Sequence, residues 1–177
     1  MQGKKEEAVN TLNDLLYHHQ TSQSVRQTRL LVTLVYIYII AGDLDKALVA
    51  NQKLCEVATK GNHAYATVWS VYLQGLIHFY RNDLEEDIGY FRQAMDQKYI
   101  LHTRATVDSM GGLAFCYQAT GQPDMANATM KGLFDYVDPL NDPTHATVAS
   151  SCHARLSVMQ GEPKSAMGWP RESPPPL

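Results

Sequence analysis

The amino-acid sequence predicts an all-α protein, a superhelix (solenoid) of antiparallel helix pairs with a period of about 39–40 residues. The first observation is a turn segment that recurs along the chain. It occurs as Gly3-KKEE-Ala8, Gly42-DLDK-Ala47, Asn82-DLEE-Asp87, Gly121-QPDM-Ala126 and Gly161-EPKS-Ala166. Successive copies begin 39 or 40 residues apart, and a constant period of this length is typical of helical repeat arrays.

The second observation is the chemistry of these turns. Gly and Asn accept the left-handed backbone that ends a helix, and the acidic residues that follow complement the dipole of the next helix. Pro123 and Pro163 stand just inside two of the following helices, where a proline sacrifices no hydrogen bond. Asp142-Pro143 has the same pattern and predicts another helix start.

The third observation is apolar spacing after the turns. Residues in steps of three and four place one apolar stripe on one helix face. Two clear examples are Leu84, Ile88, Phe91, Met95 and Ala126, Met130, Leu133, Val137.

Each helix in the first part of the chain follows from these signals. Residues 4–19 carry Ala8, Leu12 and Leu15 in helical spacing after a charged start. Residues 24–41 end in the apolar run Leu30–Ala41, which at twelve residues is shorter than the roughly 20 that a membrane span needs. Because Gly42 terminates this run, we interpret it as a helix end rather than a strand or a membrane segment. The turns at Gly42 and Asn82 then delimit predicted helices at 44–60, 64–81 and 84–98.

The remaining helices follow in the same way. The Gly121 turn separates residues 102–120 from 123–137, and Asp142-Pro143 and Gly161 delimit 143–160 and 163–169. We expect residues 3–170 to form one helical repeat domain. The final segment, RESPPPL (171–177), predicts a flexible tail, because its prolines prevent a helix from continuing.

Composition excludes several classes of function. The formal net charge is −3 and the basic residues are scattered, so we expect no direct contact with nucleic acid. Cys55, Cys116 and Cys152 form no C-x-x-C pair, which favours reduced thiols in the core of a cytoplasmic protein.

Small and aromatic positions align with the tetratricopeptide repeat (TPR) motif when each turn glycine is counted as its fifteenth position. Gly75, Phe91 and Ala94 match in one repeat, whereas Val35 and Asp87 stand where small residues are expected. The period exceeds the standard TPR period of about 34. With the segments LAFCYQATGQPDMA and ARLSVMQGEPKSAMGW, the chain resembles the TPR-like superhelix of large bacterial LuxR-type transcriptional regulators, the group that includes the maltose-regulon activator.

This resemblance implies a noncatalytic sensor and interaction arm, which in that family lies between an ATPase and a helix-turn-helix domain. It implies that a protein partner or a small inducer binds in the concave groove of the superhelix. Two alternatives remain open at this point. One is a self-association module that forms a homodimer through apolar surfaces such as Met167 and Trp169, and the other is a peptide-binding adaptor.

The resemblance also indicates candidate binding residues, because the first helix of each TPR pair lines the concave face. The polar and aromatic residues at those positions are Arg29, Tyr36, Trp69, Tyr72, Tyr80, Asp108, Phe115, Gln118 and Arg155. These side chains either form a recognition surface or, in the case of the aromatic rings, pack on one another inside the superhelix.

Neither a metal site nor a catalytic site is predicted, and no cofactor is expected. His63, His102 and His145 each lie near a helix start, but neighbouring helices are about 8–10 Å apart, too far for shared ligation by short side chains. The acidic cluster Glu85-Glu86-Asp87 falls in a first helical turn, where acidic residues are expected for electrostatic reasons.

Overall fold

The computed structural model describes residues 2–18 and 24–166. Over these ranges all regular elements are helical, which confirms the predicted all-α class. They are α1 (Gln2–His18), α2 (Ser24–Ile40), α3 (Leu44–Lys60), α4 (Ala64–Arg81), α5 (Leu84–Met95), α6 (Thr103–Ala119), α7 (Pro123–Val137), the 3₁₀ helix η1 (Asp138–Leu140), α8 (Pro143–Met159) and α9 (Pro163–Ala166). The predicted tail and the predicted association patch at Met167 and Trp169 lie outside the described residues.

The predicted turn residues have the backbone conformation that their chemistry requires. The φ angles of Gly42, Asn82, Gly121 and Gly161 are +75°, +63°, +76° and +79°. At the first of these turns, the N–H of Asp43 donates to the Tyr38 carbonyl at 2.9 Å and that of Gly42 donates to Ile39 at 3.0 Å. This pair of bonds is a Schellman motif, and it recurs at the other three turns.

Two local features differ from the prediction. Helix α5 ends at Met95 rather than at residue 98, because the N–H groups of Gln97 and Lys98 bond to carbonyls three residues earlier and tighten the chain into turns. A 3₁₀ helix, η1, also follows α7 directly. Each helix in the described ranges falls short of the length or the apolar character that a membrane crossing requires.

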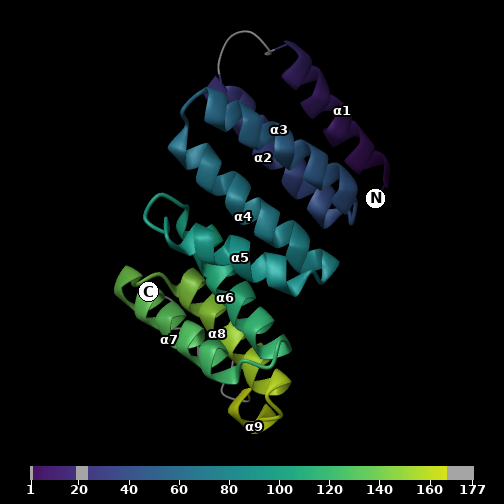
Figure 1. Ribbon diagram of the computed structural model, residues 1–177. Helices are drawn as coiled ribbons and strands as arrows, with labels where there is room; N and C mark the ends of the chain where they lie inside the picture. The colour runs from purple at the N-terminus through teal and green to yellow at the C-terminus, as the bar shows by residue number, and fades with distance from the viewer. Residues whose placement is uncertain (1, 19–23, 167–177) are drawn as a thin grey trace, which may run out of the picture. The chain divides into compact units, whose positions relative to one another are not determined.

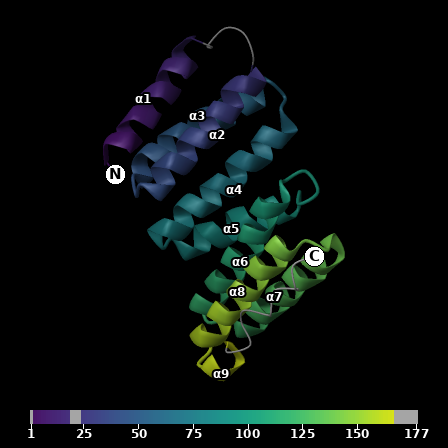
Figure 2. The same ribbon diagram turned by 180° about the vertical axis from the view of Figure 1, so that it is seen from behind.

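The chain divides into two compact units, residues Met1–Leu101 and His102–Leu177. In the first unit α3 packs against both α2 and α4, α2 also contacts α4 directly, and α1 and α5 pack on α2 and α4 respectively. Figures 1 and 2 show this sequential packing from opposite sides. In the second unit α6 packs against α7 and α8, α7 against α8, and α8 against α9. Helices adjacent in sequence are therefore neighbours in space within each unit.

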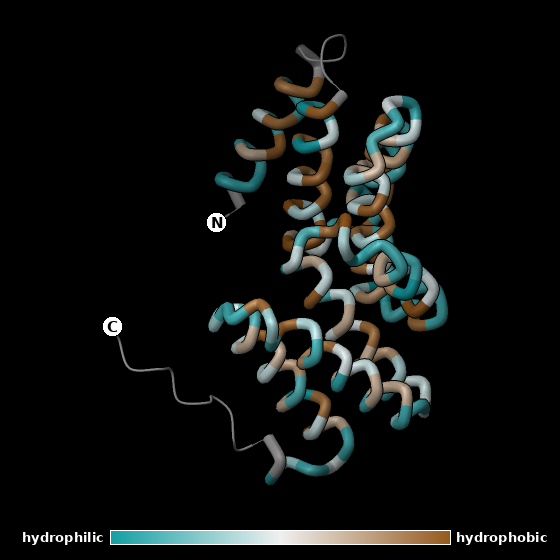
Figure 3. The backbone as a smooth tube through the Cα atoms, turned by 90° about the vertical axis from the view of Figure 1, so that its left-hand side faces the viewer, coloured by the Kyte–Doolittle hydropathy of each residue, from teal (hydrophilic) through white to brown (hydrophobic). Residues whose placement is uncertain are grey.

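Apolar residues recur along the helices with polar residues between them, as the hydropathy colouring in Figure 3 shows. The largest fully buried side chains of the first unit include Leu31, Leu54, Tyr72 and Phe91. Those of the second include Leu133, Val137 and Leu156. Helices α3, α5 and α7 thus contribute one face to a core, as the stripes of three and four predicted. Helix α6 differs, because its residues from Gly111 to Tyr117 are all buried.

The positions that depart from the TPR pattern are nonetheless buried. Val35 and Asp87 are both 0% exposed. Of the three cysteines, Cys116 is buried and Cys152 is half-buried, but Cys55 is exposed. The expectation of a core position was therefore wrong for Cys55. It follows the fully buried Leu54 directly, and a step of one residue turns a helical side chain about 100° away from the core.

Helix α8 begins at a side-chain cap. The Oδ1 atom of Asp142 accepts a hydrogen bond from the backbone N–H of Thr144 at 2.8 Å, and Oδ2 lies 2.8 Å from Nδ1 of His145. The bond from Thr144 is the largest cause that lowers the pKa of Asp142 below its ordinary value of 3.8, and His145 lowers it further, against the opposing effect of desolvation.

Replacing Asp142 with Asn is expected to lower the stability of the second unit near neutral pH and to have no effect in strong acid. Asn caps a helix about as well as Asp, so the difference isolates the charge. A carboxylate with a pKa lowered on folding stabilises the fold above its ordinary pKa, and that contribution is lost as the pH falls through the folded pKa. Urea unfolding of both proteins between about pH 6 and pH 2 would measure this. A difference that grows on acidification would contradict the assignment.

Candidate functional site

The predicted groove residues fall into two sets, one in each unit. Arg29, Tyr36, Trp69, Tyr72 and Tyr80 lie on α2 and α4 of the first unit. The second set, on α6 and α8 of the second unit, is Asp108, Phe115, Gln118 and Arg155.

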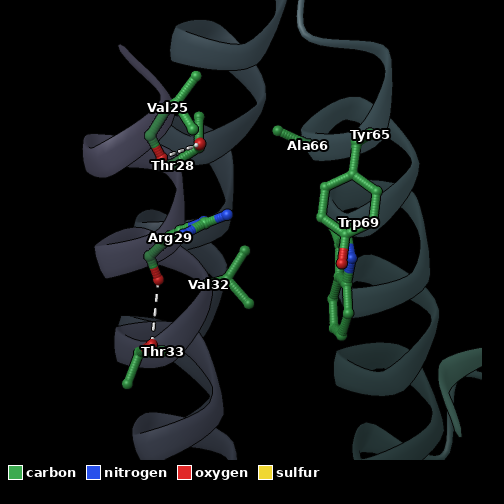
Figure 4. Close-up of a pocket in the computed structure, with 8 residues that line it drawn as sticks. All are labelled: Val25, Thr28, Arg29, Val32, Thr33, Tyr65, Ala66 and Trp69. Carbon is green, nitrogen blue, oxygen red and sulfur yellow. Dashed lines mark hydrogen bonds between the residues drawn. The ribbon is translucent and has the colours of Figure 1, made fainter. Parts of the chain in front are cut away.

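In the first unit, a cleft of about 530 Å³ lies between the N-terminal halves of α2 and α4. Its lining residues are Val25, Thr28, Arg29, Val32, Thr33, Tyr65, Ala66 and Trp69. Figure 4 shows Arg29 and Val32 extending from α2, with Tyr65 and Trp69 facing them from α4. Two of the predicted residues, Arg29 and Trp69, therefore line one cavity. Its volume lies within the range of about 300–1,000 Å³ that small-molecule sites occupy.

One wall of the cleft belongs to a cluster of aromatic rings. The Trp69 ring makes edge contacts with Tyr65 and Tyr36, both at centroid distances of 6.0 Å, and with Tyr72 at 5.6 Å. The hydroxyl of Tyr36 donates to that of Tyr72 at 3.2 Å. Rings at these distances attract one another beyond simple burial, so the wall is held by its own packing.

The predicted aromatic residues differ in their access to a ligand. Tyr72 is 1% exposed and belongs to the core, where it stacks on Phe91 at 6.4 Å. It supports the wall and is not among the residues that line the cleft. Tyr80 is 59% exposed at the other end of α4, where its ring contacts Phe79.

Tyr65 lines the cleft but was not among the predicted residues. It precedes Trp69 by four residues on α4, which places both rings on one helix face. That spacing is the sequence signal that would have identified it. The TPR positions miss Tyr65 because it precedes the first position of the motif that points into the groove.

Some polar side chains of the cleft already form hydrogen bonds within the protein, and others do not. The Thr28 hydroxyl donates to the Val25 carbonyl at 2.8 Å, and that of Thr33 donates to the Arg29 carbonyl at 3.0 Å. By contrast, the Arg29 guanidinium forms no ion pair with any residue in the described ranges. The Arg29 side chain is therefore the charged group of the cleft that remains open to a ligand.

The indole nitrogen of Trp69 is the second polar group without an internal partner. Its Nε1 atom is buried and forms no hydrogen bond to any other described residue. A buried donor without an acceptor costs about 1–3 kcal/mol. Such unsatisfied groups are rare in folded proteins.

In the second unit, the predicted polar residues are bound to neighbours. The Arg155 guanidinium lies over the Phe115 ring, 4.4 Å from its centroid. Asp108 accepts from Nε of Arg104 at 2.9 Å, and Oε1 of Gln118 accepts from Gln160 at 2.9 Å. These contacts hold the α6–α8 surface together, so the polar groups there are less available than Arg29.

Cys152 lies within this surface. A Cβ atom on Gly111 would lie 2.8 Å from its Sγ atom, so the glycine makes room for the thiol. Burial, and secondarily the charge of Asp108, raise the pKa of Cys152. The thiol is therefore protonated near neutral pH, which makes it a poor nucleophile. Over residues 2–18 and 24–166, no group of three His, Cys, Asp or Glu side chains is arranged to hold a metal ion.

Comparisons of this chain with protein-family models, with curated proteins and with solved structures each found no match. The class of the protein is therefore argued from its own residues. Within the described residues, the chain is an all-helical protein whose consecutive helices pack on one another. The cleft between α2 and α4 is lined by aromatic, cationic and small apolar or hydroxyl side chains.

Proposed function

We propose that this chain is a noncatalytic, TPR-like recognition module that binds a small ligand or a protein partner at the α2–α4 cleft. One observation carries the proposal. The cleft brings the Arg29 guanidinium, which forms no ion pair with any described residue, against a packed aromatic wall formed by Tyr65 and Trp69. Concave, mostly apolar sites with a few well-placed polar groups are the usual form of ligand-binding pockets.

The chemistry of the lining supports binding rather than catalysis. None of the described residues that line the cleft is His, Cys, Asp, Glu or Lys. The hydroxyls of Thr28 and Thr33 are bonded to backbone carbonyls, which leaves the Tyr65 hydroxyl as the remaining group of a type used in acid–base or nucleophilic catalysis among these residues. The Arg29 guanidinium is a cation that carries hydrogen-bond donors only. It can attract and orient an anion.

We extend the proposal to the whole array. The helix pairs would stack as a TPR-like superhelix, and the module would serve as the cytoplasmic sensor or interaction arm of a bacterial transcriptional regulator. The recurrence of one Schellman turn at Gly42, Asn82, Gly121 and Gly161 supports a repeat of this kind. A ligand held by both α2 and α4 would bias how these neighbouring helices stack, which is how a signal passes along an array of this type.

The proposal is tested by mapping binding on the isotope-labelled chain with a library of small molecules and short peptides of mixed charge. The expected result is that the hits shift the backbone amide signals of Val25–Thr33 and Tyr65–Trp69. Replacing Tyr65 with Ala is expected to weaken these hits by several-fold, because Tyr65 is half-exposed and supplies one face of the cleft.

The matched control is Tyr99→Ala, which removes a tyrosine that is 89% exposed and does not line the cleft. This variant is expected to bind the hits as the unmodified chain does. A library that shifts no cleft signals, or hits that Tyr65→Ala and Tyr99→Ala weaken equally, would reject the proposed binding module.

A further inference from the structure

We infer that the α2–α4 cleft takes a small organic carboxylate whose anionic group meets Arg29 and whose apolar or aromatic body lies against Tyr65 and Trp69. This inference rests on the proposed function and specifies the chemical class of its ligand.

The charged side chains of the cleft and of the two helices that form it are all basic. Neither α2 nor α4 contains an Asp or Glu residue, and none of the described lining residues is acidic. Arg26 stands one turn before Arg29 on α2 and adds to the same positive field. Arg29 itself is solvent-exposed and pairs with no acidic side chain of the described residues, so it can reach an anion and hold it by charge-assisted hydrogen bonds.

The single positive charge of the lining distinguishes a carboxylate ligand from a phosphate ligand. Arg29 is the one charged side chain among the described residues of the lining. A planar guanidinium pairs with a carboxylate through two parallel hydrogen bonds and balances its single charge. A phosphate carries nearly two negative charges, of which one guanidinium balances about one. The lining therefore favours a carboxylate.

The rest of the lining defines the body of the ligand. Val25, Val32 and Ala66 are apolar, and the hydroxyls of Thr28 and Thr33 are already bonded to the backbone of their own helix. Tyr65 and Trp69 present ring surfaces. With one cationic group and otherwise apolar walls, the cleft matches a ligand that has one anionic end and an apolar or aromatic body.

The test uses benzoate and phenylacetate, each paired with its primary amide. The amide preserves the shape of the acid but removes its charge. Trp69 serves as the fluorescence reporter in a Trp169→Phe background, because the chain has 2 tryptophans. At least one acid is expected to bind about ten-fold more tightly than its amide, which corresponds to about 1.4 kcal/mol. In parallel, NMR of the backbone amide signals of the cleft residues locates the binding site.

Arg29→Gln is expected to abolish this preference, so that acid and amide bind with equal affinity. Arg29→Lys should restore part of it, since a point charge replaces the planar fork. Arg26→Gln is the matched control: it removes the same charge from the same helix at a residue that does not line the cleft. It is expected to retain most of the preference.

Equal binding of acids and amides to the unmodified chain would overturn the carboxylate assignment but would leave the proposed binding module standing, provided that the cleft signals shift. Equal loss of preference in Arg26→Gln and Arg29→Gln would also overturn it, because only the general field of α2 would then be acting. If no member of the panel shifts the cleft signals, the assignment falls, whereas the proposed function is decided separately by the mixed library.

Discussion

Tyr72→Ala is expected to destabilise the first unit by about 3–5 kcal/mol, the usual cost of truncating a buried aromatic residue to Ala. Tyr72 is 1% exposed and contacts Trp69 and Phe91 through its ring. Its removal leaves a cavity at the centre of the aromatic cluster and frees Trp69 to move. The measurement is urea unfolding followed by circular dichroism.

Two control variants distinguish the loss of the Tyr72 ring from the loss of its hydroxyl and from the truncation of an exposed tyrosine on the same helix. Tyr72→Phe keeps the ring and removes the hydroxyl bonded to Tyr36, so it is expected to cost only about 0.5–1.5 kcal/mol. Tyr80→Ala removes a tyrosine of the same helix that is exposed, and it is expected to stay within about 0.5 kcal/mol of the unmodified chain. If Tyr72→Ala and Tyr80→Ala cost the same, the described core would be incorrect.

Gly75→Ala is expected to destabilise the first unit by about 1–3 kcal/mol, although alanine favours helices more than glycine does. A Cβ atom at this position would lie 2.7 Å from Cδ1 and 2.8 Å from Cε1 of Phe91. Phe91 is almost completely buried, so its ring cannot move aside without disturbing α5. Thermal unfolding should show a lower midpoint.

Gly89→Ala is the matched control for this substitution. Gly89 is exposed on α5, and a Cβ atom there would meet no other atom within 4 Å. The same chemical change is therefore expected to stabilise the unit by about 0.5–1 kcal/mol through helix propensity. Opposite signs for the two variants are the expected outcome. Stabilisation by both would show that α4 and α5 are not packed closely at Gly75.

Most of the fold could be predicted because its signals are local. A left-handed turn at Gly42 or Asn82 depends on the residue itself and on carbonyls within the preceding turn. A helix start at Pro123 or Pro143 depends on the missing N–H of that residue. The end of α5 at Met95 was missed, because no Gly or Pro marks the tightening of the chain there.

The candidate site could be predicted only in part. Arg29 and Trp69 do line one cavity, and Tyr36 lies in contact with Trp69. The repeat pattern did not separate the buried Tyr72 from the exposed Tyr80, since both occupy helix positions assigned to the groove. It also did not show that Asp108, Gln118 and Arg155 are held by neighbouring side chains.

Residue types and their spacing were sufficient to establish that this is an all-helical chain with turns at a constant interval. Those properties arise from hydrogen bonds and steric limits that act over about five consecutive residues. Which ring is buried, which thiol is exposed and which residues line the cleft emerged only from the packing of α2 against α3 and α4 and of α6 against α8. Burial and ion pairing depend on side chains tens of residues apart, whose distances are set when the helices come together.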